Sequence, residues 1–207
     1  MAESYVVDRY RPSDHDTLYE ICLRTGDAGQ DASGRHDDPA LLGHVYLGAY
    51  LHLEPGLARV LRGVDGVAAG YVVGTADTVA FEKACHEVWW PPLRARYPLP
   101  AETDDSPDAD LVRTIHRGLR TTGDWLPRYP AHLHVDLLPP AQGNGHGRAL
   151  LETFFDAVGA RGAAGVHLGV GSQNVAAIGF YEHLGLRTVE PRGWGQVMAA
   201  QLPLTAR

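Results

Sequence analysis

Three glycines at alternate positions stand directly before a helical pattern, in the loop Gln142-Gly143-Asn144-Gly145-His146-Gly147-Arg148. Glycine lets the backbone turn tightly and leaves its N–H groups uncovered by side chains. At the start of a helix these groups lie at the positive end of the macrodipole, where an anionic phosphate is stabilised. The loop is therefore predicted to hold a pyrophosphate, and a glycine-rich turn without a ligand is the alternative.

Polar side chains alternate along the segment before this loop, at His132, His134 and Asp136. Alternate residues of a strand share one face, so the three are expected to lie together. A carboxylate or a neutral imidazole can act there as a general base. A polar sheet face satisfied by neighbouring helices is the alternative, and it is the favoured interpretation for His134. A third metal ligand at a fixed spacing is missing, so no metal is expected.

Hydrophobic patterning gives the elements that must position these residues. Residues 132–138 alternate as a strand does, and Pro139-Pro140 ends it because proline cannot donate to a ladder. The glycine loop then opens a helix with the apolar face Leu150, Leu151, Phe154, Phe155 and Val158. A short strand at 166–170 and a helix over 172–184, closed by Gly185, follow.

Two common nucleotide loops do not match. The dinucleotide fingerprint requires G-x-G-x-x-G and an acidic residue about 20 positions later. Here the order is G-x-G-x-G, and Ala163, Ala164 and Gly165 stand at that distance. The P-loop requires Gly-Lys-Ser or Gly-Lys-Thr, and the only lysine of the chain is Lys83.

The spacing Gln-x-x-Gly-x-Gly resembles instead the acetyl-CoA pyrophosphate loop of the GCN5-related N-acetyltransferases (GNAT). The following helix carries Asn174-x-x-Ala177-Ile178-x-Phe180-Tyr181-Glu182-x-x-Gly185-Leu186. This is similar to the family motif N-x-x-A-x-x-[LF]-Y-x-x-x-G-F, with Leu186 in place of the usual phenylalanine. Two motifs in the right order, on elements of the right type, are far more specific than either motif alone.

The resemblance implies that acetyl-CoA is the cofactor. The amides of the glycine loop, with Arg148 nearby, would hold its pyrophosphate, and Gln142 occupies a position where the family has Arg or Gln. Leu137 and Leu138 at the end of the strand would pair with pantetheine, and an exposed N–H there would polarise the thioester oxygen. Asn174 would bind CoA or cap its own helix.

The resemblance also assigns the proton transfers. Tyr181 occupies the general-acid position of the family, where a phenol protonates the leaving thiolate; a core tyrosine is the alternative. Asp136 lies nearest the pantetheine end of the strand and is the first choice for the base, directly or through a water. His134 is the second choice.

Composition restricts the partners and the compartment. A net charge of −7, with scattered arginines as the main cations, argues against nucleic acid. No apolar run approaches the length of a membrane span. Only Cys22 and Cys85 are present, and the start of the chain lacks the pattern of a signal peptide. We expect a cytoplasmic protein.

The remaining segments predict an α/β fold: one GNAT domain over 1–207, with a mixed, mostly antiparallel central sheet of about seven strands and helices on both faces. The predicted elements before the glycine loop are a strand at 5–10, helices with Ser13 and Pro39 near their starts, and a hairpin around Val64-Asp65-Gly66. A helical insert follows at about 76–130, with helices near 80–96 and 110–121, and is expected near the substrate side.

The first half resembles one branch of the family, the acetyltransferase-like domain of O-GlcNAcase and its free-standing bacterial relatives. The animal domain has lost its glycine loop, whereas this chain keeps the glycines. The matching segments are Ile21-Cys22-Leu23-Arg24-Thr25-Gly26-Asp27, Leu42-Gly43-His44-Val45-Tyr46-Leu47-Gly48, Leu53-Glu54-Pro55-Gly56-Leu57, Gly70-Tyr71-Val72-Val73-Gly74-Thr75 and Trp89-Trp90-Pro91.

The predicted function is acetyl-CoA-dependent N-acetyl transfer to a primary amine, directly in a ternary complex, because neither motif contains a cysteine nucleophile. The acceptor is a small-molecule amine or a lysine of a peptide or protein. Asp27 could bind an ammonium group, and Trp89 and Trp90 could stack on a sugar or peptide; a solvated loop and core packing are the alternatives. The rival function is a catalytically weak or inactive module that binds CoA or a peptide or glycopeptide. Monomer and homodimer are both open.

Overall fold

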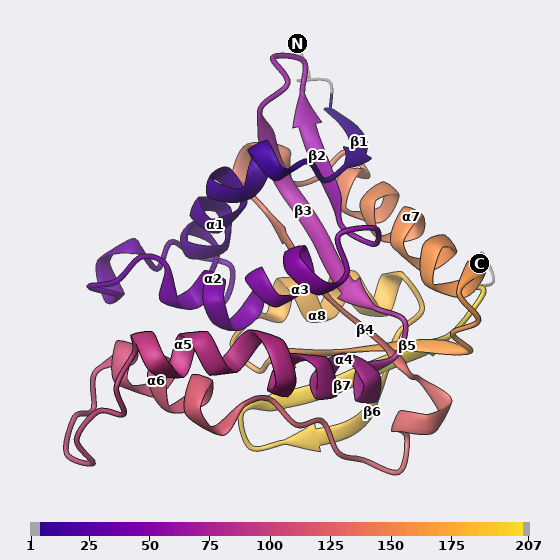
Figure 1. Ribbon diagram of the computed structural model, residues 1–207. Helices are drawn as coiled ribbons and strands as arrows, with labels where there is room; N and C mark the ends of the chain where they lie inside the picture. The colour runs from indigo at the N-terminus through magenta and orange to yellow at the C-terminus, as the bar shows by residue number, and fades with distance from the viewer. Residues whose placement is uncertain (1–4, 205–207) are drawn as a thin grey trace.

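The computed structural model describes residues 5–204 and contains a seven-stranded sheet in the order β1-β2-β3-β4-β5-β7-β6 (Figure 1). All neighbouring strands are antiparallel except β4 and β5, which are parallel. This confirms the predicted fold class. The strands are β1 (Tyr5–Arg9), β2 (Arg59–Gly63), β3 (Ala68–Thr75), β4 (Ala131–Leu137), β5 (Gly165–Gly171), β6 (Arg187–Arg192) and β7 (Gly195–Gln201).

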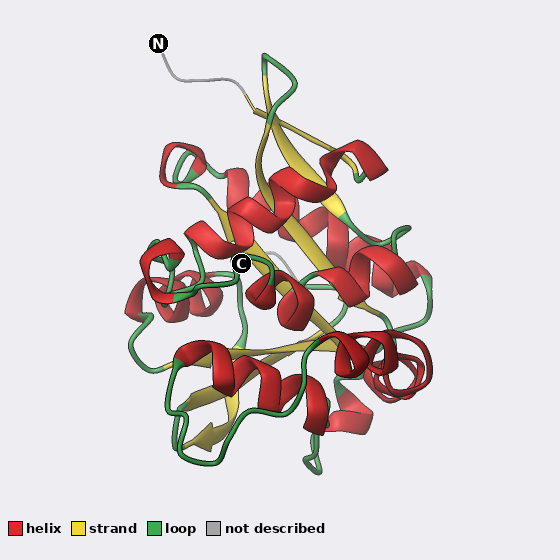
Figure 2. Ribbon diagram, turned by 60° about the vertical axis from the view of Figure 1, so that its left-hand side comes forward, coloured by secondary structure: helices red, strands yellow, loops and turns green. Residues whose placement is uncertain are grey.

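Helices cover both faces of the sheet (Figure 2). They are α1 (His15–Arg24), α2 (Leu41–Tyr46), α3 (Gly48–Leu53), α4 (Thr78–Ala84), α5 (Trp90–Arg96), α6 (Pro107–Arg117), α7 (His146–Ala160) and α8 (Val175–His183). Within residues 5–204, no helix combines the length and the apolar composition needed to cross a membrane.

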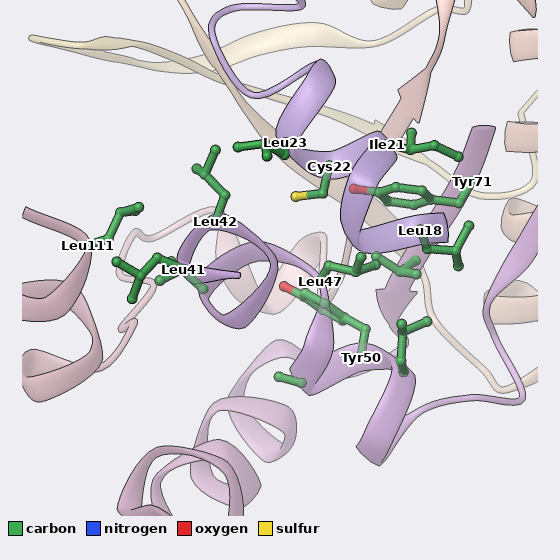
Figure 3. Packing of buried hydrophobic residues seen from close by; sticks show 14 of the residues in the cluster. Leu18, Ile21, Cys22, Leu23, Leu41, Leu42, Leu47, Tyr50, Tyr71 and Leu111 are labelled. Atoms are coloured by element: carbon green, nitrogen blue, oxygen red, sulfur yellow. The ribbon is translucent and has the colours of Figure 1, made fainter. Parts of the chain in front are cut away.

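Alternate residues of β3 divide the core into two parts. Tyr71 and Val73 point into a cluster with α1, α2, α3 and the insert, part of which is drawn in Figure 3. Val72 points to the other face, into a cluster with α7, α8 and β5. The period of two that defines a strand therefore places α7 and α8 on one side of the sheet and α1 to α3 on the other.

The sheet splits between β4 and β5. The two strands pair only at their beginnings, where Ala131 faces Val166 and His132 faces His167. β4 stays paired with β3 up to Leu137, and β5 stays paired with β7 along its whole length. The two halves of the sheet therefore diverge beyond His132, leaving one edge of β4 unpaired from Leu133 onward.

The insert between β3 and β4 is helical, as predicted, but its boundaries differ from those expected. The helix expected near 80–96 consists of α4 and α5, joined by a π-helical turn over Cys85–Trp89. The prolines after Trp90 lie in the first turn of α5, where the missing N–H costs nothing. α6 begins earlier than expected because Ser106 caps it, accepting from the Ala109 amide at 3.2 Å.

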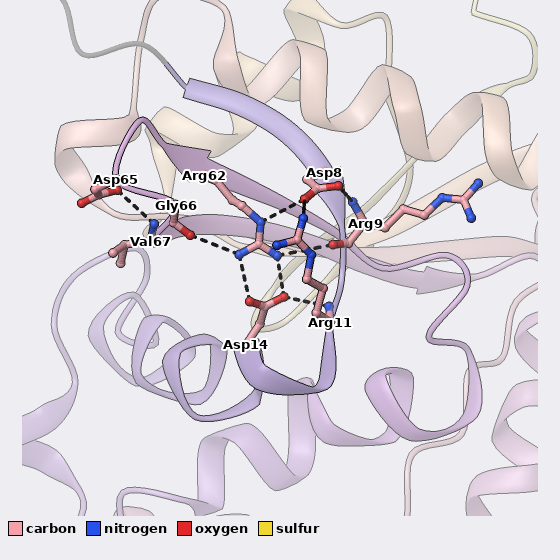
Figure 4. A network of polar contacts seen from close by, with 8 residues as sticks. All are labelled: Asp8, Arg9, Arg11, Asp14, Arg62, Asp65, Gly66 and Val67. Atoms are coloured by element: carbon pink, nitrogen blue, oxygen red, sulfur yellow. Dashed lines mark hydrogen bonds and ion pairs between the residues drawn. The ribbon is translucent and has the colours of Figure 1, made fainter.

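The start of α1 also differs from the prediction. Ser13 is not its N-cap, because Pro12–Asp14 form a separate 3₁₀ turn and the helix begins at His15. This turn places Asp14 against Arg62 of β2 (Figure 4). Arg62 donates to both carboxylate oxygens of Asp14, at 2.8 and 2.6 Å, and to Asp8 at 3.2 Å. Burial acts to raise the pKa of Asp14, but the hydrogen bonds from Arg62 and from the Arg11 amide outweigh it and lower the pKa.

Replacing Arg62 by methionine is expected to lower the free energy of unfolding by about 3–5 kcal/mol, because it leaves the Asp14 carboxylate buried without its cation. The Arg62 side chain is only 7% exposed, so water cannot replace the lost contacts. Denaturant unfolding followed by circular dichroism measures the change. Arg11→Ala is the control: Arg11 contacts Asp8 from a side chain that is 61% exposed, and its loss should cost about 1 kcal/mol or less. Equal losses in the two variants would contradict a buried ion pair.

Candidate active site

The glycine loop has the backbone conformation of an anion cradle. Gly143, Asn144 and Gly145 all have positive φ, at 79°, 50° and 81°. A Cβ built at Gly143 or Gly145 would meet no atom within 4 Å, so the space beside the loop is open. At Gly147 a Cβ would lie 3.1 Å from Phe180 Cζ, so glycine also lets α8 approach the start of α7.

The loop leaves its amides available to a ligand. Within residues 5–204, the N–H groups of Asn144, Gly145, Gly147 and Arg148 donate to no carbonyl or side chain. They surround the positive end of a fifteen-residue helix that no side chain caps. Free amides, open space and a helix N-terminus together fit a pyrophosphate.

Two polar side chains of this region already have partners. Arg148 contacts Glu152 at 3.3 Å on the exposed surface of α7. An exposed ion pair of this kind contributes little free energy, so Arg148 can leave Glu152 and contact a phosphate instead. Gln142 Nε2 donates to the Leu137 carbonyl at 2.9 Å, which attaches the loop to the end of β4.

The register of β3 and β4 decides which amide at the end of β4 is free. Leu138 N donates to Ala69 O at 2.9 Å, so its N–H points toward β3 and is not available, contrary to the prediction. N–H direction alternates along a strand, so the amides of Val135 and Leu137 point toward the split beside β5. Leu137 remains a candidate donor to a thioester oxygen, and Leu138 is corrected to a residue whose backbone belongs to the sheet.

Asp136 is half-buried beside the split, on the face of β4 that carries α1. Tyr71 lies directly opposite on β3, and its hydroxyl donates to Asp136 Oδ2 at 2.5 Å. Burial raises the pKa of Asp136 to about 6, against the opposing effect of the hydroxyl groups of Tyr71 and Thr25. The carboxylate is therefore mostly ionised at neutral pH and more basic than an ordinary aspartate, as a general base requires.

Cys22 of α1 lies next to this pair, with the Tyr71 ring pointing toward it (Figure 3). Burial, together with the charge of Asp136, raises the pKa of the Cys22 thiol to about 12. The nucleophile of a covalent route is the thiolate, which is scarce at neutral pH when the pKa is this high. Cys22 is therefore a poor candidate for a covalent nucleophile, although it lies close to Asp136.

Tyr181 of α8 is 8% exposed and belongs to the core cluster on the opposite face. Burial raises the pKa of its phenol, and the negative charge of Asp136 raises it further. Since Asp136 lies on the α1 face, the two groups influence each other from opposite faces of the sheet. Within the described residues the Tyr181 hydroxyl has no hydrogen-bond partner, so it is free to donate to a ligand.

Asn174 caps α8. Of the two predicted roles for this residue, CoA binding and capping of its own helix, the structure shows the cap. Its Oδ1 accepts from the Ala177 amide at 3.2 Å. A Cβ at Gly29 would lie 3.6 Å from Asn174 Nδ2, so the loop after α1 passes close to this helix start.

The two histidines of β4 are poor bases. His132 uses both ring nitrogens: Thr78 donates its proton to Pro130 O and so accepts from His132 Nδ1, while Tyr50 donates to Nε2 at 2.6 Å. Burial lowers the pKa of His134 to about 4, with a further contribution from His167. His134 is neutral and weakly basic, which favours Asp136.

A cavity of about 340 Å³ opens on the same face of β4 as these histidines. The insert, β5, β7 and the α2–α3 region form its wall, and the lining includes six Phe, Tyr or Trp side chains and three histidines. We call it the acceptor cavity. Its lining residues include His134, Tyr46, Tyr50, Phe81, Trp90, Trp125, His167 and Trp194.

The predicted acceptor residues are not brought together. Trp90 lines the acceptor cavity, whereas Trp89 lies outside that lining and donates to His44 O at 2.9 Å. Asp27 also lies outside it, forms an ion pair with Arg35 and borders a separate hollow of about 260 Å³.

Several residues of the site carry no local sequence signal. Tyr71 is one apolar position in a hairpin strand, and only the β3–β4 register shows that it contacts Asp136. Trp125 and His167 belong to segments far apart in the chain, yet their rings form an edge-to-face pair with 4.6 Å between the ring centroids. Only the folded sheet brings Tyr71, Trp125 and His167 close to the residues that the two motifs predict.

Comparisons with known proteins agree with this geometry. Residues 119–186, which include the glycine loop and α8, match the family model of the acetyltransferase (GNAT) family. The crystal structure of SsHAT is 42% identical with a TM-score of 0.91, covering 96% of this chain and 98% of that one.

Two more distant structures share the fold. YncA, a putative acetyltransferase from Salmonella typhimurium solved with its cofactor acetyl-CoA, is 18% identical with a TM-score of 0.57, covering 99% of this chain and 97% of that one. The PaiA N-acetyltransferase from Thermoplasma acidophilum, in complex with coenzyme A, is 14% identical with a TM-score of 0.58, and the match covers 96% of this chain and 99% of that one. With the identity and coverage shared with SsHAT and the family match over both motifs, this chain belongs to the GNAT family of acetyltransferases.

Proposed function

We propose that this protein transfers an acetyl group from acetyl-CoA to a primary amine, directly, in a ternary complex. The observation that carries the proposal is the split between β4 and β5. It lies beside the glycine loop, and Asp136 and Tyr181 reach it from opposite faces of the sheet.

The residues around the split would bind the cofactor in two places. The free amides of Asn144, Gly145, Gly147 and Arg148 would hold the pyrophosphate. The unpaired edge of β4 would bind the pantetheine arm through the backbone groups of Val135 and Leu137. Acetyl-CoA supplies the acetyl group as an activated thioester.

Three groups of the chain would then act on the reacting atoms. The Leu137 N–H would donate to the thioester oxygen as negative charge develops on it. Asp136 would take the proton of the attacking amine, directly or through a water. Tyr181, kept protonated by its raised pKa, would donate a hydrogen bond to the leaving sulfur and stabilise its developing charge.

Replacing Tyr181 by phenylalanine is expected to lower kcat by about 10²-fold, because the leaving sulfur loses its only proposed donor. The ring that packs in the core is retained, so the Kd of acetyl-CoA should stay within about twofold of wild type. Steady-state release of the CoA thiol measures kcat, and calorimetry measures the Kd.

Phe180→Leu is the matched control, because it alters packing next to Tyr181 without removing a proton donor. Its kcat should stay close to that of wild type. Unchanged turnover in Tyr181→Phe would remove Tyr181 as the acid. Acetyl-CoA binding without turnover of any amine by the wild-type protein would favour the binding module over the enzyme.

A further inference from the structure

Aromatic side chains gather in the lining of the acceptor cavity. Six aromatic side chains from six segments of the chain line it: Tyr46, Tyr50, Phe81, Trp90, Trp125 and Trp194. Its volume of about 340 Å³ lies at the small end of the range for small-molecule sites. Aromatic walls favour the faces and edges of a ring over a flexible chain.

The charges of the lining give a cationic amine no net attraction. Glu190 balances the charge of Arg192, which leaves the Arg120 guanidinium and the Glu82 carboxylate as the charges of the lining. Glu82 already accepts from the Thr121 amide at 2.7 Å. The histidines add no negative charge, and burial lowers the pKa of both His134 and His167 to about 4. An alkyl amine, with a pKa near that of lysine at about 10.4, would have to enter this cavity as an ammonium ion.

Trp90 leaves a donor without a partner in this wall. Its side chain is 1% exposed, and its Nε1–H has no hydrogen-bond partner among the described residues. A buried unpaired donor of this kind costs about 1–3 kcal/mol, which a ligand would recover if its binding turned the indole N–H toward an acceptor atom. Trp89, one residue earlier, has its N–H satisfied by His44 O.

Arg120 is a second donor without a partner. Its side chain is exposed and lines the cavity, and no carboxylate of residues 5–204 pairs with it. Arg192, the other cation of the lining, is paired with Glu190 at 2.8 Å. The cavity therefore offers one free positive charge to a ligand.

We propose that the acceptor is a small aromatic amine that carries an anionic group, with its ring among the aromatic side chains of the acceptor cavity and its anionic group on Arg120. The Trp90 N–H donates to an oxygen of the same ligand. The nitrogen of an aromatic amine is uncharged at neutral pH, so it reaches the split without a buried charge that the lining would have to compensate. This inference rests on the proposed function, because it names the substrate of that same site.

The position of the cavity agrees with transfer to such an amine. His134 lines the cavity, and Asp136 is the next residue on the same face of β4, about 7 Å further along the strand. An amine nitrogen at the His134 end lies next to the proposed base. The nitrogen attacks the acetyl carbon, the C–S bond breaks, and the sulfur leaves as a thiolate that accepts a hydrogen bond from the Tyr181 hydroxyl. The amine proton passes to Asp136 and on to solvent, and the thiolate takes up a proton from solvent to give the CoA thiol.

The test measures acetylation of 4-aminobenzoate, aniline, cadaverine and an N-terminally blocked lysine peptide by the wild-type protein. We expect kcat/KM for 4-aminobenzoate to exceed that for aniline at least about tenfold, the worth of one charge-assisted hydrogen bond. Cadaverine and the lysine peptide should be poorer still. A preference for cadaverine or the peptide would overturn the inference.

Two pairs of variants assign the effect to residues. Arg120→Ala should remove the advantage of 4-aminobenzoate over aniline, whereas Arg117→Ala, an exposed arginine outside the lining, should keep it. Trp90→Phe should raise the KM for 4-aminobenzoate about fivefold or more, and Trp89→Phe should not. An unchanged preference in Arg120→Ala would contradict the proposed role of its charge.

Calorimetry separates this inference from the function on which it rests. The Kd of acetyl-CoA should be the same in all four variants, since none of these residues lies at the glycine loop. If acetyl-CoA does not bind, the proposed function fails. If acetyl-CoA binds and only alkyl amines are acetylated, the function stands and the aromatic acceptor is wrong.

Discussion

Replacing Asp136 by asparagine is expected to lower kcat by about 10²- to 10⁴-fold, the usual contribution of a general base. The amide has nearly the same size and can still meet the Tyr71 hydroxyl, but it cannot accept the proton of the amine. In the proposed site acetyl-CoA binds through the backbone of β4 and the glycine loop, so its Kd should change by no more than about twofold.

The pH profile gives this prediction a second measurement. The base is active when ionised, so kcat/KM of the wild-type protein should fall as the pH drops below the Asp136 pKa of about 6. In Asp136→Asn, kcat/KM should show no such acidic limb, that is, no fall around this pH. Tyr71→Phe removes a hydrogen bond that lowers the Asp136 pKa, so in that variant the limb should move to higher pH. Full activity with an unchanged limb in Asp136→Asn would show that the base is another group, with His134 the first to examine.

Replacing Gly145 by glutamate is expected to abolish acetyl-CoA binding, with a rise in Kd of at least about 100-fold. Gly145 has φ of 81° and stands beside the free amides of the loop. A side chain there would enter the open space that the pyrophosphate needs, and its carboxylate would repel the phosphates.

Gly162→Glu is the matched control for this variant. Gly162 also has positive φ, at 89°, and open space around it, but it follows the other end of α7. Both variants carry the same backbone strain and the same added charge, so both should lose similar stability. Only Gly145→Glu should lose acetyl-CoA. Retained affinity in Gly145→Glu would disprove the assignment of the phosphate site.

The parts of the site that the sequence predicted are those defined by local chemistry. The glycine loop, the helix after it and the cap at Asn174 depend on residues within one or two turns of each other. The β2–β3 hairpin follows from Asp65-Gly66, where Gly66 takes the positive φ of 79° that the turn requires. Such features need no knowledge of the rest of the fold.

The parts that were wrong or missing depend on register and on long-range packing. Whether Leu137 or Leu138 presents a free amide is decided by one residue of register between β3 and β4, which the long insert separates. The same register places Tyr71 on Asp136. Trp89 and Trp90 are consecutive residues of one helical segment and point in different directions, so one lies outside and the other inside the lining of the acceptor cavity.

The most direct test of the central claim is a calorimetric titration of the purified protein with acetyl-CoA, repeated with Gly145→Glu and Gly162→Glu. We predict one site per chain with a Kd on the order of micromolar, matched by a rise in Tm at saturating ligand. The site should be lost in Gly145→Glu and kept in Gly162→Glu. The absence of both heat and a Tm shift in the wild-type protein would contradict an acetyl-CoA site at the split between β4 and β5.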